Sequence, residues 1–348
     1  MSTPLLPRRA AIASLAGLGL IAKFGPVRAA KPFEPPAALV DAARKEGEMV
    51  LYTAAFPEVM QDTIALFNKR FGAIKVRMVR ASGGQLITRA RTEASQNKLE
   101  ADVLDHSDRG QTKSLEDILA DYAPPNAADY IPETLVSPKI WPSITPSWSI
   151  AWNTELVKDP PKSWAELCDP KWSGGKIGQV IAPSGGTTWT RAMFERQVMG
   201  EEYWAKQAAT KPKLHPSGAP LSDAVVRGEI LVAPLIFNIV YPKKKEGAPI
   251  DGLYPAEGIP IVPYGAAIPK AARHPNAARL WMDWMLSDEG QAHSLRDQGN
   301  VTSLRNPPIA PPGFDPAKHK LWTPDFKQFD ALRDQWLEDW NRTYGYRQ

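Results

Sequence analysis

The stretch that decides the fold opens with Val50-Leu51-Tyr52-Thr53, a short apolar run that predicts a strand. Residues 57–71 then place apolar side chains on one face and predict a helix. A second strand is expected over residues 74–79, where apolar and basic side chains alternate, followed by a helix to about residue 95. Asp102-Val103-Leu104 completes a β-α-β-α-β pattern, which predicts a parallel sheet covered by helices.

The rest of the chain continues to alternate strands and helices. Residues 124–146 are rich in proline and predict a surface excursion, after which residues 148–152 predict a strand that leaves the first sheet. Further strands are expected over residues 176–181, 230–237 and 259–268, and helices over residues 189–199, 222–227, 276–286 and 326–341.

The first thirty residues have the layout of a secretory signal. They contain four basic residues and no acidic ones, with Arg8-Arg9 ahead of an uncharged run and Val27-Arg28-Ala29-Ala30 at the end. The uncharged run, residues 10–21, is shorter than the roughly 20 residues that span a bilayer. We therefore expect a signal peptide over residues 1–30, cleaved near residues 29–30 in the periplasm. The paired arginines favour the twin-arginine route, and the general secretory route stays open.

Composition excludes several classes of partner. The chain has 42 basic and 38 acidic residues, a net charge of +4 that the four basic residues of the leader account for. The sequence has no basic stripe with interleaved aromatic residues, so we expect no nucleic-acid binding. It also has no later apolar run long enough to span a bilayer, so we expect no direct membrane insertion. One cysteine, Cys168, allows no disulfide within the chain. The mature length exceeds what one core usually takes, so we expect two lobes, in a monomer.

Two blocks of sequence resemble periplasmic substrate-binding proteins of ABC importers. The first is Trp148-Ser149-Ile150-Ala151-Trp152-Asn153-Thr154-Glu155-Leu156-Val157 with Pro160-Pro161-Lys162-Ser163-Trp164-Ala165-Glu166-Leu167. The second is Asn276-Ala277-Ala278-Arg279-Leu280-Trp281-Met282-Asp283-Trp284-Met285-Leu286-Ser287-Asp288-Glu289-Gly290-Gln291. The most similar group includes binders of ferric ion, thiamine and aminoethylphosphonate.

This resemblance implies an α/β chain with the type II two-lobed fold. Each lobe would hold a mainly parallel sheet flanked by helices, with a ligand cleft between the lobes and two strands crossing between them. Residues 31–147 and 264–348 would form the first lobe, and residues 148–263 the second. The implied partners are a small-molecule solute and a membrane permease, with no cofactor and no enzymatic activity.

Two glycine loops are the strongest candidate ligand sites. Ser82-Gly83-Gly84 and Ser184-Gly185-Gly186-Thr187-Thr188 each lie between a predicted strand and a predicted helix. A helix start offers free N–H groups and a partial positive charge, glycine lets an anion approach, and hydroxyls add donors. The alternative interpretation is that both loops are ordinary turns.

Other candidates come from the predicted strand ends and from the resemblance. Asp105-His106-Ser107-Asp108 follows the third strand, where ligands bind in open α/β sheets, and it could also serve a secreted enzyme as an acid/base or metal-ligand set. The resemblance places Ile239-Val240 where iron binders carry two tyrosines, so it disfavours ferric binding and predicts no metal site. Asn238 and Tyr241 remain candidates for hydrogen bonding in the cleft.

The sequence thus predicts a periplasmic protein that captures a small polar solute by lobe closure and delivers it to a permease. The solute is expected to be an organic anion or a zwitterion. Ferric ion with an exogenous anion and a secreted enzyme on the same fold are the alternatives. The candidate ligand-binding residues are Thr53, Ser82, Gly83, Gly84, His106, Ser107, Trp152, Ser184, Gly185, Gly186, Thr187, Asn238 and Tyr241.

Overall fold

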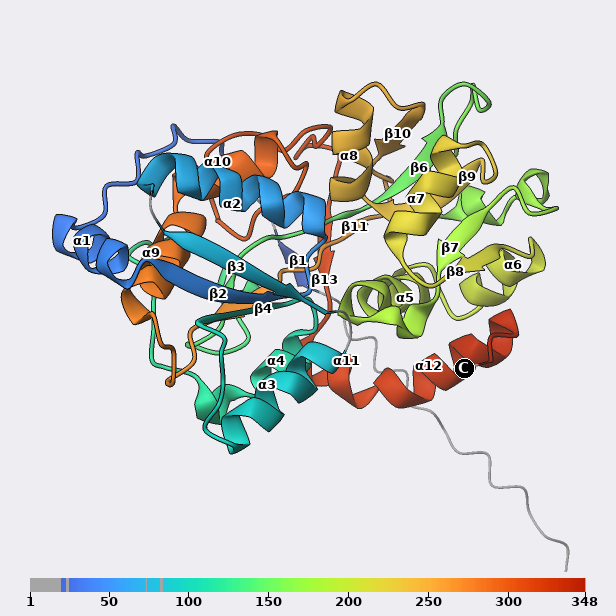
Figure 1. The fold of residues 1–348 in the computed structure, drawn as a ribbon. Helices are drawn as coiled ribbons and strands as arrows, with labels where there is room; N and C mark the ends of the chain where they lie inside the picture. The colour runs from blue at the N-terminus through green and yellow to red at the C-terminus, as the bar shows by residue number, and fades with distance from the viewer. Residues whose placement is uncertain (1–19, 23–24, 73, 82–83, 348) are drawn as a thin grey trace, which may run out of the picture.

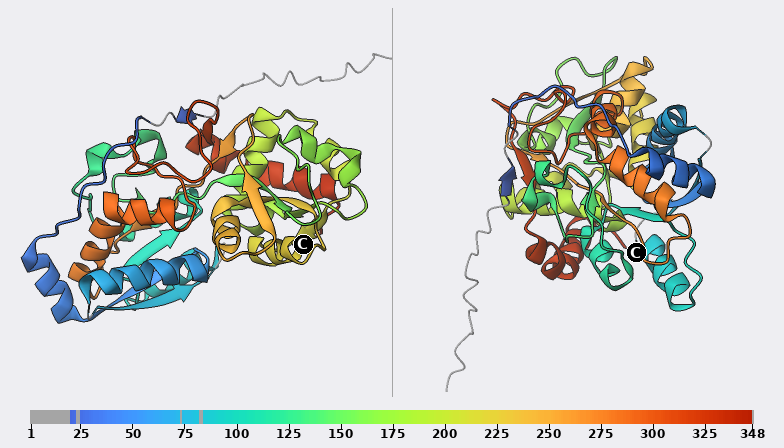
Figure 2. Two further views of the ribbon diagram at one scale, coloured as in Figure 1. Left: turned by 90° about the horizontal axis from the view of Figure 1, so that it is seen from above. Right: turned by 90° about the vertical axis from the view of Figure 1, so that its left-hand side faces the viewer.

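The computed structural model describes residues 20–22, 25–72, 74–81 and 84–347. Two α/β lobes lie side by side and give the molecule an elongated outline (Figures 1 and 2). The first lobe carries the N-terminal helices and strands together with the helices of residues 275–296, and the second carries the helices of residues 186–245. Most of the predicted leader, residues 1–19, lies outside the described residues, whereas β1 (Leu20–Ala22) pairs with β13 (Leu321–Thr323).

The first lobe contains a five-stranded sheet with the strand order β3-β2-β4-β12-β5. The strands are β2 (Glu48–Thr53), β3 (Lys75–Arg80), β4 (Val103–His106), β5 (Trp141–Pro142) and β12 (Gly265–Ala267). β3 and β4 both pair with β2 in parallel, as the β-α-β-α-β pattern predicts. β12 returns from the second lobe and pairs antiparallel with both β4 and β5.

Helices bury both faces of this sheet, which explains the continuous apolar run from Met49 to Tyr52 in β2. Met49 and Leu51 face the cluster that contains Phe67 of α2, whereas Val50 and Tyr52 face the cluster that contains Leu86 of α3. Successive strand residues point to opposite faces, so a strand covered on both sides needs a continuous apolar run. The helices of this lobe are α1 (Ala37–Glu46), α2 (Pro57–Phe71), α3 (Gln85–Ser95), α4 (Arg109–Lys113), α9 (Pro275–Met285) and α10 (Asp288–Arg296).

The second lobe is built on two small sheets that touch. β6 (Trp148–Asn153) lies between β10 (Ile250–Leu253) and β9 (Val232–Ile236) and is antiparallel to both. β7 (Gly178–Val180) and β8 (Lys213–His215) are parallel, and an isolated bridge joins Ile177 to Val232. The helices are α5 (Gly186–Val198), α6 (Tyr203–Ala209), α7 (Gly218–Val226) and α8 (Phe237–Lys245).

Two extended segments run side by side between the lobes. The N–H of Val262 donates to the carbonyl of Pro146 at 2.9 Å, and the N–H of Tyr264 donates to the carbonyl of Ile144 at 2.8 Å. β11 (Ile259–Pro260) leads into one of these segments, and β6 continues the other. Since both segments cross from one lobe to the other, they mark the expected hinge.

The proline-rich segment is not a surface excursion, and that prediction is wrong. Tyr130, Ile140 and Trp141 are buried, and the Tyr130 hydroxyl donates to the carbonyl of Leu286 at 2.8 Å. Short 3₁₀ turns, Ala127–Asp129 and Pro132–Thr134, satisfy the backbone groups that a proline-rich chain cannot pair in a sheet. The segment therefore forms an inner wall of the first lobe.

The predicted C-terminal helix is two helices that meet at Leu332. α11 (Phe326–Ala331) packs against α4 of the first lobe, whereas α12 (Arg333–Tyr344) packs against α6 of the second (Figure 1). The Trp336 ring lies edge-on to the rings of Trp189 and Trp204, 6.3 Å away in each case. The C-terminal segment thus contacts both lobes.

Candidate functional site

A cleft of about 310 Å³ lies between the lobes, beside the crossing segments. The first lobe contributes Ala54, Phe56, Arg80 and Ser107, and the crossing segments contribute Trp148 and Tyr264. The second lobe contributes Val180, Ser184, Gly185, Thr187, Thr188, Pro216, Ser217, Gly218, Leu235, Ile236 and Ile239. Four of the predicted ligand-binding residues therefore line one cleft, namely Ser107, Ser184, Gly185 and Thr187.

Two helices of the second lobe begin at the wall of this cleft. α5 begins at Gly186, directly after Ser184 and Gly185, and α7 begins at Gly218, directly after Ser217. The Ser184 hydroxyl donates to the carbonyl of Pro216 at 2.7 Å and so ties the two helix starts together. The first turn of any helix leaves N–H groups without an intrahelical partner and carries a partial positive charge. Two such ends converge on the cleft.

Gly186 lets α5 approach the first lobe closely. A Cβ on Gly186 would lie 2.7 Å from the Ser107 carbonyl oxygen and 2.7 Å from the Asp108 Cα, both of them backbone atoms that cannot easily move. The predicted residue Gly186 is buried by this contact and does not line the cleft. Its role in the structure is to bring the start of α5 next to the end of β4.

Arg80 is the only charged residue among the described residues that line the cleft. It is the last residue of β3, one residue short of the first glycine loop in the sequence, and its side chain is exposed. The cleft therefore combines one guanidinium, two helix N-termini and several hydroxyls, with no carboxylate in its described lining. This arrangement favours a negatively charged group.

Tyr264 and Trp148 form the wall of the cleft nearest the hinge. Burial raises the pKa of Tyr264 to about 12, although hydrogen bonds with Thr187 and Ser107 act in the opposite direction. The Tyr264 hydroxyl is therefore a neutral donor at physiological pH. The indole N–H of Trp148 donates to the carbonyl of Thr187 at 3.1 Å, which fixes the first turn of α5 against the crossing segment.

Arg191 of α5 holds this helix against β7 and against Trp148. It is fully buried, pairs with Glu195 on the same helix at 3.1 Å and donates to the carbonyl of Val180 at 2.9 Å. Its guanidinium also lies over the Trp148 ring, 5.0 Å from the ring centroid. These contacts hold the helix whose N-terminus faces the cleft, so the donors are positioned before any ligand arrives.

Asp105 of β4 is buried and does not line the cleft, but it binds side chains from two other segments of the first lobe. Its carboxylate accepts from the Thr53 hydroxyl at 2.9 Å and from the Ser143 hydroxyl at 2.6 Å. Burial raises the pKa of Asp105 to about 6, even though both hydrogen bonds lower it. The predicted residue Thr53 is thus fully buried as a partner of Asp105, and it is absent from the described lining of the cleft.

Several other predicted residues also lie away from the cleft. His106 is buried, and its Nδ1 accepts from the N–H of Asp108 at 3.0 Å. Trp152 is half-buried in β6 and pairs with Asp251 of β10. Gly84 is exposed at the N-cap of α3. Ser82 and Gly83 lie outside the described residues.

A second hollow, which we call the outer groove, lies between the same two lobes and measures about 870 Å³. It is lined by α2 and α10 of the first lobe and by α7 and α8 of the second. The predicted residue Asn238 is at this groove, not in the cleft, and its amide donates to the Asn300 side chain at 3.0 Å. Tyr241 lines neither hollow and stacks on Phe237, with 5.5 Å between ring centroids.

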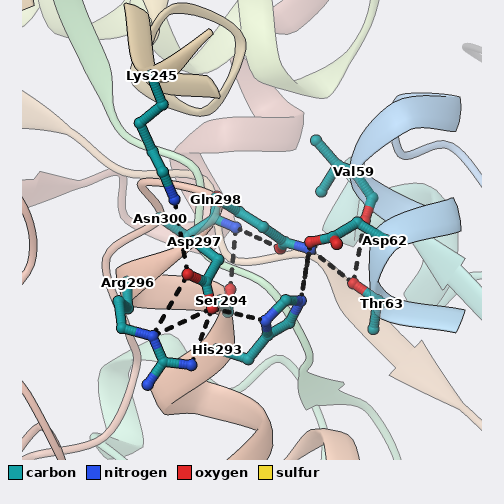
Figure 3. A network of polar contacts seen from close by, with 10 residues as sticks. All are labelled: Val59, Asp62, Thr63, Lys245, His293, Ser294, Arg296, Asp297, Gln298 and Asn300. Carbon is teal, nitrogen blue, oxygen red and sulfur yellow. Dashed lines mark hydrogen bonds and ion pairs between the residues drawn. The ribbon is translucent and has the colours of Figure 1, made fainter. Parts of the chain in front are cut away.

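A polar network forms the end of the outer groove near α10 (Figure 3). His293 lies between two carboxylates, 2.9 Å from Asp297 and 3.0 Å from Asp62 of α2. Lys245 of α8 reaches Asp297 across the lobe boundary at 3.6 Å. Since its charges are largely paired with each other, this network ties α2, α10 and α8 together and offers no excess charge to a ligand.

Sequence reasoning missed Arg80, Ser217 and Tyr264 of the cleft. For Ser217 a signal was present: Pro216-Ser217-Gly218 has the same hydroxyl-glycine character as the loop before α5, but the helix was expected to start four residues later. No local pattern singles out Arg80 or Tyr264, because their places in the cleft depend on the sheet order and on the path of the crossing segment.

The described residues contain neither a metal-binding cluster nor a membrane-spanning helix. No group of three or more His, Cys, Asp or Glu side chains in the described part of the chain is arranged to hold a metal ion. Within those same residues, no helix is both long enough and apolar enough to cross a membrane.

Comparison with known proteins gives consistent matches over most of the chain. Residues 48–292 match the family model of the bacterial extracellular solute-binding proteins. An uncharacterised protein of Haemophilus influenzae is 29% identical over 331 residues, which cover 87% of this chain and 92% of that protein.

Solved structures share the fold. AfuA, a periplasmic binding protein of Actinobacillus pleuropneumoniae solved with exogenous fructose-6-phosphate bound, has a TM-score of 0.71 and 23% identity, covering 86% of this chain and 99% of its own. The substrate-binding protein of an ABC transporter from Agrobacterium tumefaciens has a TM-score of 0.74 and 16% identity, covering 87% of this chain and 96% of its own. These neighbours confirm the two-lobed type II fold that the sequence predicts. With a family match that spans most of its length, the chain belongs to the bacterial extracellular solute-binding proteins.

Proposed function

We propose that this protein captures a small organic anion in the cleft between its lobes and delivers it to the permease of an ABC importer. Members of this family bind a small-molecule solute and work with such a permease. The observation that carries the choice of an anion is the charge of the cleft: Arg80 is its only charged described residue, and the starts of α5 and α7 face it.

The donor set suits a phosphate, phosphonate or carboxylate group. Ser107, Thr187 and Ser217 supply hydroxyls, and Tyr264 supplies a neutral phenol. Hydrogen bonds to a charged group contribute about 1.5–3 kcal/mol each, so three or four of them would hold a solute firmly. AfuA shows that this fold can hold a phosphate ester, which supports the proposal without identifying the solute.

The same geometry disfavours the two alternatives. Phenolate binding of ferric ion would need tyrosines in the cleft, but Tyr241 stacks on Phe237 outside the cleft and Tyr264 is a single phenol that burial keeps neutral. A secreted enzyme would need His106 at a substrate, whereas its ring is buried against the backbone of Asp108. Binding without turnover fits the cleft better.

The experiment that tests the proposal replaces Arg80. Arg80→Gln should weaken the binding of phosphate and of fructose 6-phosphate by roughly 10- to 100-fold in calorimetric titration, because one charge-assisted contact is lost. The matched control is Arg77→Gln on the same strand, whose side chain pairs with Glu100 at 3.1 Å outside the cleft and should not affect binding. Equal binding by wild type and Arg80→Gln would reject an anion site at this cleft.

We also propose that the leader directs export of the chain to the periplasm and is cleaved near residues 29–30. Arg8-Arg9 ahead of an uncharged run supports the twin-arginine route. Replacing both arginines with lysine should then abolish accumulation in the periplasmic fraction. Normal accumulation of the double variant would reject this route and favour general secretion.

A further inference from the structure

The cleft and the outer groove are neighbours that share two lining residues. Phe56 and Ile239 appear in the walls of both hollows, and they come from opposite lobes. Phe56 is the residue before α2, and Ile239 lies in the first turn of α8. The boundary between the two hollows therefore consists of apolar side chains from both lobes. Binding of an anion does not by itself require such a boundary.

Both side chains reach the start of α7, where Gly218 leaves room for them. A Cβ on Gly218 would lie 2.6 Å from Cδ1 of Ile239 and 3.7 Å from Cζ of Phe56. The two apolar side chains therefore converge over one point, with the anion-binding cleft on one side and the outer groove on the other. We call Phe56, Ile239 and Gly218 the partition.

The two hollows differ in size and in character. The cleft measures about 310 Å³, and since a water molecule takes about 30 Å³ of liquid, it has room for roughly ten water-sized groups. The outer groove measures about 870 Å³ and has an apolar stretch formed by Val59, Leu66 and Pro242. A solute longer than the cleft would have a ready channel for its tail if the partition were open.

We propose that the partition sets the length limit of the solute, so that the protein accepts compact anions and excludes anions with an extended apolar tail. This inference rests on the proposed anion function and adds the size class to it. The partition would act by occupying the path between cleft and groove, because Phe56 and Ile239, from opposite lobes, both lie near Gly218 where the two hollows adjoin. Phe56 is half-buried, whereas Ile239 is 8% exposed and packs in the core, so Phe56→Ala is the milder of the two truncations.

The test titrates wild type and variants with methyl, butyl and hexyl phosphate and with carboxylates of matching length. Wild type should bind the methyl compound and lose affinity as the chain grows. Phe56→Ala should raise the ratio of hexyl phosphate affinity to methyl phosphate affinity by at least about tenfold over wild type, since each buried CH₂ contributes up to about 0.8 kcal/mol. Ile239→Ala, from the other lobe, should extend the range in the same way.

Leu66→Ala provides the matched control, because Leu66 lines only the outer groove. Alone it should change nothing, whereas added to Phe56→Ala it should reduce the gain for hexyl phosphate. The proposed length limit is overturned if wild type binds hexyl phosphate as tightly as methyl phosphate. It is also overturned if neither Phe56→Ala nor Ile239→Ala alters how affinity depends on chain length. Failure of wild type to bind any of the short anions would instead overturn the proposed anion function, and the size limit with it.

Discussion

Gly185 and Gly186 are adjacent in the chain but have opposite surroundings. A Cβ on Gly185 would meet nothing within 4 Å, and its backbone is extended, with φ 164°. Gly185→Val should therefore fold normally and place two methyl groups between an incoming anion and the first turn of α5. We expect phosphate binding to weaken by a factor on the order of 100, measured by calorimetric titration beside a thermal melt.

Gly186→Ala is the informative comparison for that experiment. Its Cβ would press on backbone atoms of Ser107 and Asp108, so this variant should lose stability by about 1–3 kcal/mol. The interpretation of the loop as an anion site fails if Gly185→Val melts normally and binds as tightly as wild type, since the loop would then be an ordinary turn.

The buried carboxyl of Asp105 predicts a particular pH dependence. Its folded pKa of about 6 lies above the value of about 3.9 expected in the unfolded chain. The folded state therefore binds the proton more tightly, so the stability due to this group is greatest below about pH 4 and is lost as the pH rises towards 6. A shift of about two units corresponds to a loss of about 3 kcal/mol.

Asp105→Asn removes this titration while keeping the shape of the side chain. The free energy of unfolding, measured by denaturant titration, should fall between pH 4 and pH 7 in both proteins. The fall should be smaller in Asp105→Asn than in wild type, by about 2–3 kcal/mol. Comparing the two proteins isolates Asp105 from the other titrating groups. Parallel pH profiles would mean that Asp105 is ionised in the folded protein at low pH as well.

The sequence located the site's loops but not the direction of each side chain. Ser184, Gly185 and Thr187 were found because hydroxyl and glycine residues at a helix start have a direct chemical meaning. The prediction that Thr53 binds the ligand rested on its place at a strand end. That place does not show where the side chain points, and the Thr53 hydroxyl donates to the buried carboxylate of Asp105 instead.

At the scale of elements, the position of each helix start decides the chemistry of the cleft. The expected β-α-β-α-β order was confirmed because local periodicity fixes it, whereas α7 begins four residues before its expected start. Gly218 has low helix propensity, whereas Pro220 lies in the first turn, where proline is tolerated; Gly218 also lies against Ile239, which favours this early start. Such tertiary contacts have no local pattern.

The C-terminal helix α12 is expected to stabilise the second lobe without affecting the cleft. Trp340 is fully buried and stacks on Tyr344, with 4.4 Å between ring centroids. Trp340→Ala should cost about 3–5 kcal/mol and lower the melting temperature by roughly 6–15 °C. Phosphate affinity measured well below the melting temperature should stay within about twofold of wild type.

Glu338→Ala on the exposed side of the same helix is the control for this variant and should change stability by less than about 0.5 kcal/mol. A melting temperature for Trp340→Ala equal to that of Glu338→Ala would show that α12 does not carry the stability assigned to it.

At the scale of the whole molecule, the function depends on contacts between distant parts of the chain. The cleft joins Arg80, Tyr264 and the start of α5, which come from both lobes and from a crossing segment. The resemblance to solute-binding proteins predicted two lobes and a cleft, but the lining residues follow from how the lobes meet. For the same reason no sequence pattern indicated that Phe56 and Ile239 would separate two hollows.

Native mass spectrometry of the protein purified without denaturation, beside Gly185→Val prepared in the same way, decides whether the cleft holds an anion. We expect wild type to carry one small solute, denaturation to release it as an anion of compact size, and Gly185→Val to carry much less of it. Release of a neutral or cationic solute, or equal occupancy in the two proteins, would contradict the claim that this cleft holds an anion at the start of α5.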